Sequence, residues 1–303
     1  MAKHRAPYDS EITKYCISRY MLFSGSQNVP SNFRFAKLDF KARNLSKEDA
    51  LHYIIEANFF GALSVSNIKK ILQYDVEYQM MDLVSENAKV SLSNDMVNGV
   101  RFHRLDGWNK YAPKPAQPER PAFMTQLDPR FVVMLHVLTK ELKEAFPHSE
   151  VEKIYHAGFY GGGALCHNQG RAMDFSGVRI DGRDYFVPFH WGKQPVPFPP
   201  GKQSAQWPVN NRNTSYRLDQ PDSDLIEEFE PNMSWRIFKL VYEVFATHAS
   251  DTSPNPSDDP PSTIGQMSLI MHPDHPTSAP GTKNGREAHN NHIHVQIGNT
   301  FVN

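Results

Sequence analysis

Two short segments of the chain carry the residue types that bind metal ions. The first, residues 166–174, reads Cys-His-Asn-Gln-Gly-Arg-Ala-Met-Asp. On one continuous strand, His167 and Asp174 would point to opposite faces, because side chains alternate and the two are seven positions apart. Gly170 lies between them and can form a turn. We therefore expect His167 on a loop and Asp174 on the following strand, with both side chains facing one point.

The second segment, residues 289–297, reads His-Asn-Asn-His-Ile-His-Val-Gln-Ile. Its alternation predicts a strand with His292, His294 and Gln296 on one face and three aliphatic residues on the other. A strand that buries its aliphatic face and aligns two imidazoles on the other face is suited to present ligands. A histidine and an aspartate from the first segment, joined by a histidine from the second, have the composition of a catalytic zinc site with one open position.

Zinc is the expected metal because the other common donor sets are missing from the sequence. The chain has only two cysteines, Cys16 and Cys166, which are too few for a four-cysteine site. It also lacks the clustered oxygen ligands that calcium prefers. We therefore predict Zn²⁺ as the cofactor.

The two segments together resemble a known group of enzymes. HNQGRAMD at 167–174, followed by HNNHIHV at 289–295, is similar to the lysostaphin/D-Ala-D-Ala-peptidase/hedgehog group of zinc peptidases, whose shared pattern is His-x6-Asp and then His-x-His. The first segment also matches the His-x-x-Gly-x-Ala-x-Asp pattern of the D-Ala-D-Ala carboxypeptidase branch. The His-x-x-His-x-His spacing of the second is closer to the penicillin-insensitive murein endopeptidases.

This resemblance implies a role for each residue of the site. His167, Asp174 and His294 would be the zinc ligands. His292 would lie beside the water that zinc activates, and His289 would line the cleft; these two are the expected catalytic residues. Zinc lowers the pKa of a bound water toward about 7 and polarises a scissile carbonyl.

The sequence departs from the carboxypeptidase branch at three places. Cys166 stands where that branch usually has a serine before its first histidine. The strand expected at 151–160 lacks the arginine usual there, and Asn291 replaces the acidic residue three positions before the last ligand. The general base of that branch is therefore missing, which favours the endopeptidase version, in which histidines take its place. His292 could accept the water proton or, as imidazolium, stabilise the oxyanion.

The function that the resemblance implies is hydrolysis of peptide bonds in peptidoglycan stem peptides or cross-links. Two alternatives remain: a D,D-carboxypeptidase that acts on D-Ala-D-Ala termini, and a non-catalytic zinc-binding module as in the hedgehog branch. The additional histidines, His289 and His292, favour catalysis. An HNH nuclease is disfavoured because no helix signal follows HNNH, and an iron dioxygenase would need His-x-Asp.

Composition limits the partners and the place of action. The 32 Lys and Arg residues balance 33 Asp and Glu, so bulk charge gives no support to nucleic-acid binding. No apolar stretch is long enough to cross a bilayer, and the N-terminus does not read as a secretory signal. We expect synthesis in the cytoplasm without a signal peptide and action in the periplasm or cell wall after non-Sec delivery or lysis. The protein would then be an effector toxin or an endolysin, with a secretion apparatus or an immunity protein as partner.

The elements that must position these residues form an α+β fold. Helices are expected at 131–146, after the Asp128-Pro129 cap, and at 234–249, capped by Ser234. The expected strands are 151–160, 172–180, 183–191, 266–271 and 292–297, and Asp181-Gly182 makes a hairpin turn. Helices and strands that mix without βα alternation predict an antiparallel sheet with flanking helices.

Proline usage predicts the domain organisation. Four prolines fall within residues 113–121, which favours an extended linker at 111–123. Residues 1–110 are expected to form a mainly helical accessory or docking domain, with a helical pattern over 47–90 that Ser46 caps. Residues 124–303 are the predicted zinc peptidase domain.

Overall fold

The structure is a computed structural model of the chain. It describes residues 41–59, 61–75, 80–83, 88–105, 124–159, 165–191, 233–249, 270–273 and 292–297. His289, the predicted linker 111–123 and most of the strand predicted at 266–271 lie outside these residues. Among the described residues, no helix combines the length and apolar character that crossing a bilayer requires.

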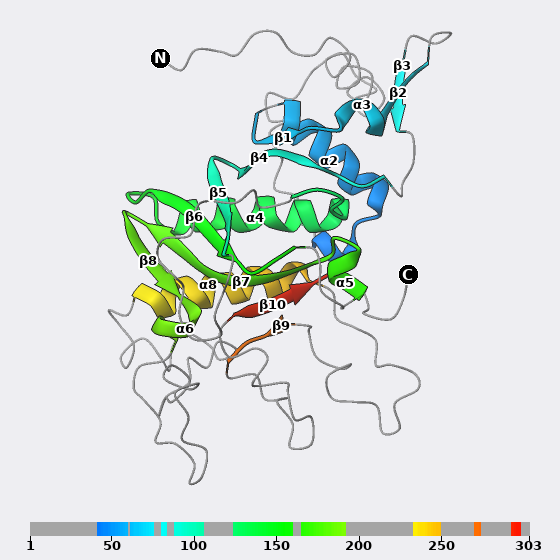
Figure 1. Ribbon diagram of the computed structural model, residues 1–303. Coiled ribbons are helices and arrows are strands. Elements are labelled where there is room, and N and C mark those ends of the chain that lie inside the picture. Colours follow the sequence, from blue (N-terminus) through cyan, green and yellow to red (C-terminus); the bar gives the residue numbers. More distant parts are fainter. Residues whose placement is uncertain are drawn as a thin grey trace, which may run out of the picture.

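The described residues form helices and strands between Ala42 and Gln296 (Figure 1). The helices are η1 Ala42–Asn44, α2 Lys47–Phe59, α3 Ile68–Ile71, α4 Pro129–Ala145, α5 Leu165–Asn168, α6 Val187–His190 and α8 Met233–His248. The strands are β1 Leu63–Val65, β2 Leu72–Asp75, β3 Met80–Leu83, β4 Leu92–Val97, β5 Val100–Arg104, β6 Val151–His156, β7 Ala172–Ile180, β8 Arg183–Phe186, β9 Ile270–Met271 and β10 Ile293–Gln296.

One mixed sheet dominates the fold, in the order β1-β4-β5-β6-β7-β10-β9, and β8 pairs with β7. The α+β prediction is therefore confirmed, but the prediction of a wholly antiparallel sheet is wrong at one pair, because β5 and β6 run parallel. A parallel pair needs a long crossover connection. Here the chain passes through α4 between the two strands, whereas the other pairs in the sheet are antiparallel.

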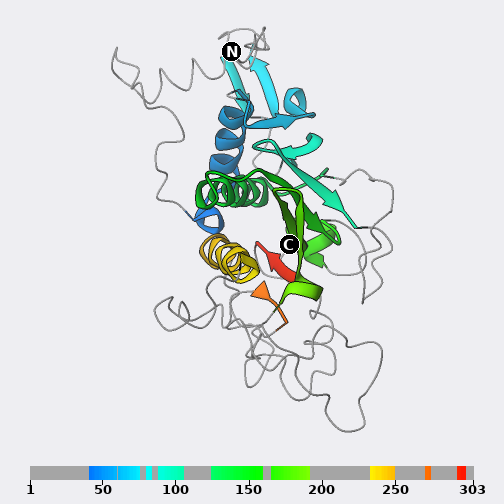
Figure 2. The same cartoon turned by 90° about the vertical axis from the view of Figure 1, so that its left-hand side faces the viewer.

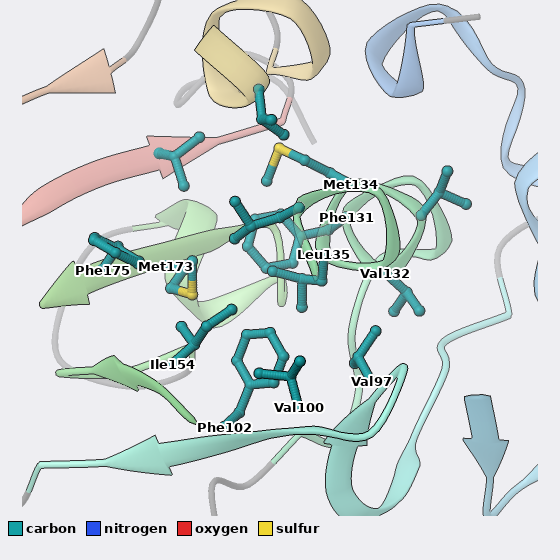
Figure 3. Close-up of a cluster of buried hydrophobic side chains, with 14 of the residues drawn as sticks. Val97, Val100, Phe102, Phe131, Val132, Met134, Leu135, Ile154, Met173 and Phe175 are labelled. Atoms are coloured by element: carbon teal, nitrogen blue, oxygen red, sulfur yellow. The ribbon is translucent and has the colours of Figure 1, made fainter. Parts of the chain in front are cut away.

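The helices α2, α4 and α8 lie together on one side of the sheet (Figure 2). Helix α4 begins as predicted, because the Asp128 carboxylate accepts a hydrogen bond from the Arg130 backbone N–H at 2.9 Å and Pro129 occupies the first turn. Its apolar stripe, which includes Phe131 and Leu135, packs onto the inner face of the sheet (Figure 3). The side chains on that inner face include Phe102, Ile154, Met173 and Phe175, all fully or almost fully buried.

Helix α8 completes this layer over the strands that carry the predicted site. Phe238 and Phe245 lie edge-to-face against Phe175 of β7, with ring centroids 6.4 Å and 6.1 Å away. The helix begins at Met233, so Ser234 is not its cap. The Ser234 hydroxyl instead donates to the His190 carbonyl at 3.1 Å, which ties α8 to α6.

The segment before residue 110 differs from the mainly helical domain that was predicted. Ser46 does cap α2, since its hydroxyl accepts from the Asp49 N–H at 2.9 Å. Beyond α2, however, strands interrupt the expected helix: β1 belongs to the main sheet, and β2 pairs with β3. Further along this segment, β4 and β5 also belong to the main sheet. The structure therefore gives no support to a separate helical unit, while the boundary at 111–123 stays a prediction.

Contacts of two histidine side chains also join the early segment to the later helices. The Tyr53 hydroxyl of α2 lies 2.6 Å from Nδ1 of His136 on α4. Nδ1 of His248 on α8 accepts from the Ala42 backbone N–H at 3.1 Å. Both histidines are buried, and the buried apolar side chains from Ala42 to Ile297 form one continuous core.

Two tight turns connect antiparallel strands of the sheet. Asp181 and Gly182, with φ of 50° and 74°, form the predicted turn between β7 and β8. Asn98 and Gly99, with φ of 51° and 79°, form the equivalent turn between β4 and β5. Left-handed values at both residues match the twist of the flanking strands, and Asn or Asp followed by Gly tolerates them best.

Candidate metal centre

The pairing of β10 with β7 brings the two motif segments together. His294 lies directly opposite Asp174 in the antiparallel register, and Val295 lies opposite Met173. Ile293 and Val295 are fully buried in the core, so alternation places His294 on the opposite face, away from α4 and α8. The predicted division of this strand into an aliphatic and a polar face is confirmed.

Gly170 forms the turn that lets His167 approach the same point. Its φ is +66°, in the left-handed region, and its N–H donates to the His167 carbonyl at 3.0 Å. His167 lies on the short helix α5 rather than on a loop, and Asp174 lies on β7 as expected. The turn therefore reverses the chain between the two residues.

Three hydrogen bonds anchor this turn to the rest of the fold. The Asp128 N–H, at the beginning of α4, donates to the Gly170 carbonyl at 3.0 Å. The Lys89 ammonium donates to the Gln169 carbonyl at 2.7 Å. The buried Arg171 guanidinium donates to the Ile297 carbonyl at 3.0 Å, which joins the beginning of β7 to the end of β10. Lys89 belongs to the segment before residue 110, so that segment helps to position the site.

Three imidazoles converge on a single oxygen of Asp174. Its Oδ1 atom lies 2.8 Å from His294 Nδ1, 3.3 Å from His167 Nε2 and 3.5 Å from His292 Nε2. Donor atoms that share one tetrahedral zinc ion lie about 3.3–3.4 Å apart, because each is about 2.0–2.1 Å from the ion. The separation between Asp174 and His167 matches that spacing, and the separation between Asp174 and His294 is shorter.

Within the described part of the chain, His167, Asp174 and His294 form a group that could hold a metal ion, with ligand atoms all within 4.8 Å of one another. The imidazoles are mostly buried, whereas the Asp174 side chain is 25 % exposed. His292 is adjacent to this group but is not part of it. His289 lies outside the described residues.

The electrostatics of the cluster favour an ionised carboxylate. Burial by itself would raise the pKa of Asp174, but the charge of His292 and the close polar contacts with His167 and His294 outweigh that effect and hold the pKa well below its usual range. Asp174 is therefore an anion at neutral pH, which is the form that binds a cation.

Gln296 is a residue of the site whose contact the sequence reasoning missed. It is 2 % exposed, and its Oε1 atom lies 3.2 Å from His294 Nε2. An amide oxygen can only accept, so His294 Nε2 carries the proton. In the neutral ring, Nδ1 is then an acceptor that faces the Asp174 carboxylate at 2.8 Å. Two acceptors at that distance repel unless a cation lies between them or the ring itself is protonated. The alternation of residues along β10 predicted that Gln296 lies on the same face as His294, and this pattern was the signal from which their contact could have been found.

A second residue without a predicted role, His156, lies on β6 beside the site segment of β7. It is fully buried, packs against Phe159 with ring centroids 4.2 Å apart and ring planes tilted by 48°, and has no hydrogen-bond partner for either ring nitrogen among the described residues. Burial lowers its pKa to about 3, so the ring is neutral. It lies opposite Phe175, whose ring faces α8, and thus belongs to the core side of the sheet.

Comparisons of this chain with protein-family models, with curated proteins and with solved structures find no match. Its function is therefore inferred from the motif residues and from the geometry of the site.

Proposed function

We propose that this protein is a zinc-dependent peptidase that hydrolyses peptide bonds in peptidoglycan stem peptides or cross-links. One observation supports the proposal most strongly: three imidazoles converge on Asp174 Oδ1, although His167 lies more than a hundred residues before His292 and His294 in the sequence. The likeness of these segments to the zinc peptidases supplies the reaction and the substrate class.

His167, Asp174 and His294 would hold the ion. Two neutral imidazoles and one carboxylate leave a single negative charge on the protein ligands and a coordination position for substrate or water, which is the donor set of hydrolytic zinc sites. When bound, zinc supplies a Lewis acid that polarises the scissile carbonyl and activates water.

The residues around the ligands would move the proton and stabilise charge. His292 Nε2 lies 3.5 Å from Asp174 Oδ1, and its side chain is 14 % exposed, so it can reach a substrate placed at the ligands. As a neutral ring it would accept a proton from the attacking water and pass it to the leaving amine; as imidazolium it would stabilise the oxyanion. His289 is proposed to line the substrate cleft.

We place the activity in the periplasm or cell wall, because that is where the substrate lies. An effector toxin or an endolysin is the class of protein that fits this place of action, and a secretion apparatus or an immunity protein is the corresponding partner.

Digestion of purified sacculi tests the proposal. The zinc-loaded protein should release muropeptides in which peptide cross-links have been opened, as identified by mass. Chelator should abolish the products and added zinc should restore them. His167→Ala and His292→Ala should be inactive, whereas Thr139→Val, a change on α4 away from the site, should remain active.

Two other outcomes of this digestion would support the alternative functions instead. Release of single D-Ala residues from stem termini would replace the endopeptidase with a D,D-carboxypeptidase. A protein that binds zinc but yields no product would be a non-catalytic zinc module. Either result contradicts the proposed reaction.

A further inference from the structure

We propose that Gln296 is a positioning residue of the metal site, which accepts a hydrogen bond from His294 Nε2 and so directs Nδ1 of that ring toward Asp174 and the ion. This inference rests on the proposed function only in that the site holds a metal; it concerns how the ligand is oriented. It is carried by the 3.2 Å contact between Gln296 Oε1 and His294 Nε2 and by the burial of Gln296.

The strand places the two side chains for this contact. Gln296 follows His294 by two positions on β10, so both project from the same face. Ala172 lies opposite Gln296 on β7, and its small side chain leaves room for the longer amide. The strand is fixed just beyond this point, because the Arg171 guanidinium and the Ile297 carbonyl join the two strand ends at 3.0 Å.

The hydrogen bond decides which ring nitrogen is available as a ligand. A neutral imidazole has one protonated nitrogen and one acceptor nitrogen. With the proton held at Nε2 by the amide oxygen, the lone pair lies on Nδ1, the atom 2.8 Å from Asp174 Oδ1. Metal-binding histidines generally donate their other N–H to such an acceptor, and its loss costs about 10–100-fold in metal affinity or activity.

Three substitutions separate this role from a general contribution to packing. Gln296→Met keeps the volume and removes the acceptor, and it should weaken zinc binding about 10–100-fold. Gln296→Glu keeps an acceptor oxygen and should bind zinc at least as tightly as the wild type. Thr139→Val removes a buried hydroxyl that donates within α4, away from the site, so it should lower the stability of the apoprotein without weakening zinc binding.

The measurement is zinc affinity by competition with a chromophoric chelator, with urea unfolding of each apoprotein beside it. Zinc binding of Gln296→Met equal to that of the wild type would overturn the proposal, as would equal weakening in Gln296→Met and Thr139→Val. Should Gln296→Met fail to fold, ¹⁵N NMR of the zinc-loaded wild type decides: a proton on Nε2 of His294 supports the proposal, and a proton on Nδ1 overturns it. A wild type that binds no zinc would overturn the metal site itself, whereas zinc binding without sacculus cleavage would overturn only the peptidase.

Discussion

Replacing Gly170 with alanine perturbs the turn that brings His167 to the metal site. A Cβ atom at this position would lie 2.2 Å from the Gln126 carbonyl oxygen and 2.8 Å from Leu127 Cα. Both atoms belong to the backbone, so no side-chain rotation relieves the contact. The segment they belong to leads directly into the Asp128 cap of α4, and Leu127 is fully buried.

Two costs follow from this geometry. The φ of +66° is unfavourable for any residue with a Cβ, by about 1–2 kcal/mol. Forced displacement of packed atoms costs a further ~1–3 kcal/mol. We therefore expect Gly170→Ala to lower the free energy of unfolding by about 2–5 kcal/mol, and to weaken zinc binding because His167 moves with the turn.

Gly182→Ala is the matched control. Gly182 has a similar φ of +74°, but a Cβ atom there would meet nothing within 4 Å among the described residues. Gly182→Ala should therefore lower the free energy of unfolding only by the cost of the left-handed backbone, about 1–2 kcal/mol, and keep the zinc affinity of the wild type. Urea unfolding with chelator present gives the stabilities, and chelator competition gives the affinities. Equal stability losses in the two variants, or unchanged zinc affinity in Gly170→Ala, would refute the reasoning.

Two further predictions concern residues that support the fold and the motif turn. Burial lowers the pKa of His136 and His248 to about 4 and that of His156 to about 3. Because these values are below that of an unfolded histidine, about 6.5, the unfolded chain binds protons at these positions as pH falls below 6.5 while the buried rings of the folded protein stay neutral, so the folded state loses stability. The free energy of unfolding should decline between pH 6.5 and 4.5, by up to about 1.4 kcal/mol per pH unit for each histidine. His156→Phe should make this decline less steep, because one of the three histidines is removed. Urea unfolding at several pH values measures the slope, and the same slope in this variant and in the wild type would contradict the prediction. Lys89→Met should weaken zinc binding, because the Gln169 carbonyl in the motif turn loses its hydrogen-bond donor. Lys140→Met changes an exposed side chain and should leave the zinc affinity unchanged. Equal zinc affinities in the two variants would contradict the role of Lys89 in anchoring the turn.

The elements that local sequence determines were predicted well. The apolar stripes of α4 and α8, the hairpin turn at Asp181-Gly182 and the two faces of β10 all depend on neighbours within a few positions. The strands before residue 110 were not predicted, because apolar residues there fit a helical period as well as a strand. One of them, β5, also pairs with β6, which is distant in sequence. Asn98-Gly99, a turn signal that was present in the sequence, would have indicated β4 and β5.

In the site too, features that depend on neighbouring residues could be predicted, whereas contacts between distant segments could not. The turn at Gly170 could be predicted from its place between His167 and Asp174. Its close contact with the Gln126 carbonyl could not, because that contact joins segments more than forty residues apart. The hydrogen bond between Gln296 and His294 was within reach of the strand pattern, but its length and burial required the three-dimensional structure.

The central claim is that His167, Asp174 and His294 hold one metal ion and that His292 acts beside it. Native mass spectrometry of the protein after incubation with zinc tests this claim most directly. One zinc per chain is expected in the wild type and in His292→Ala, and none in Asp174→Asn, His167→Ala or His294→Ala. A wild type without zinc, or full zinc occupancy in Asp174→Asn, would contradict the claim.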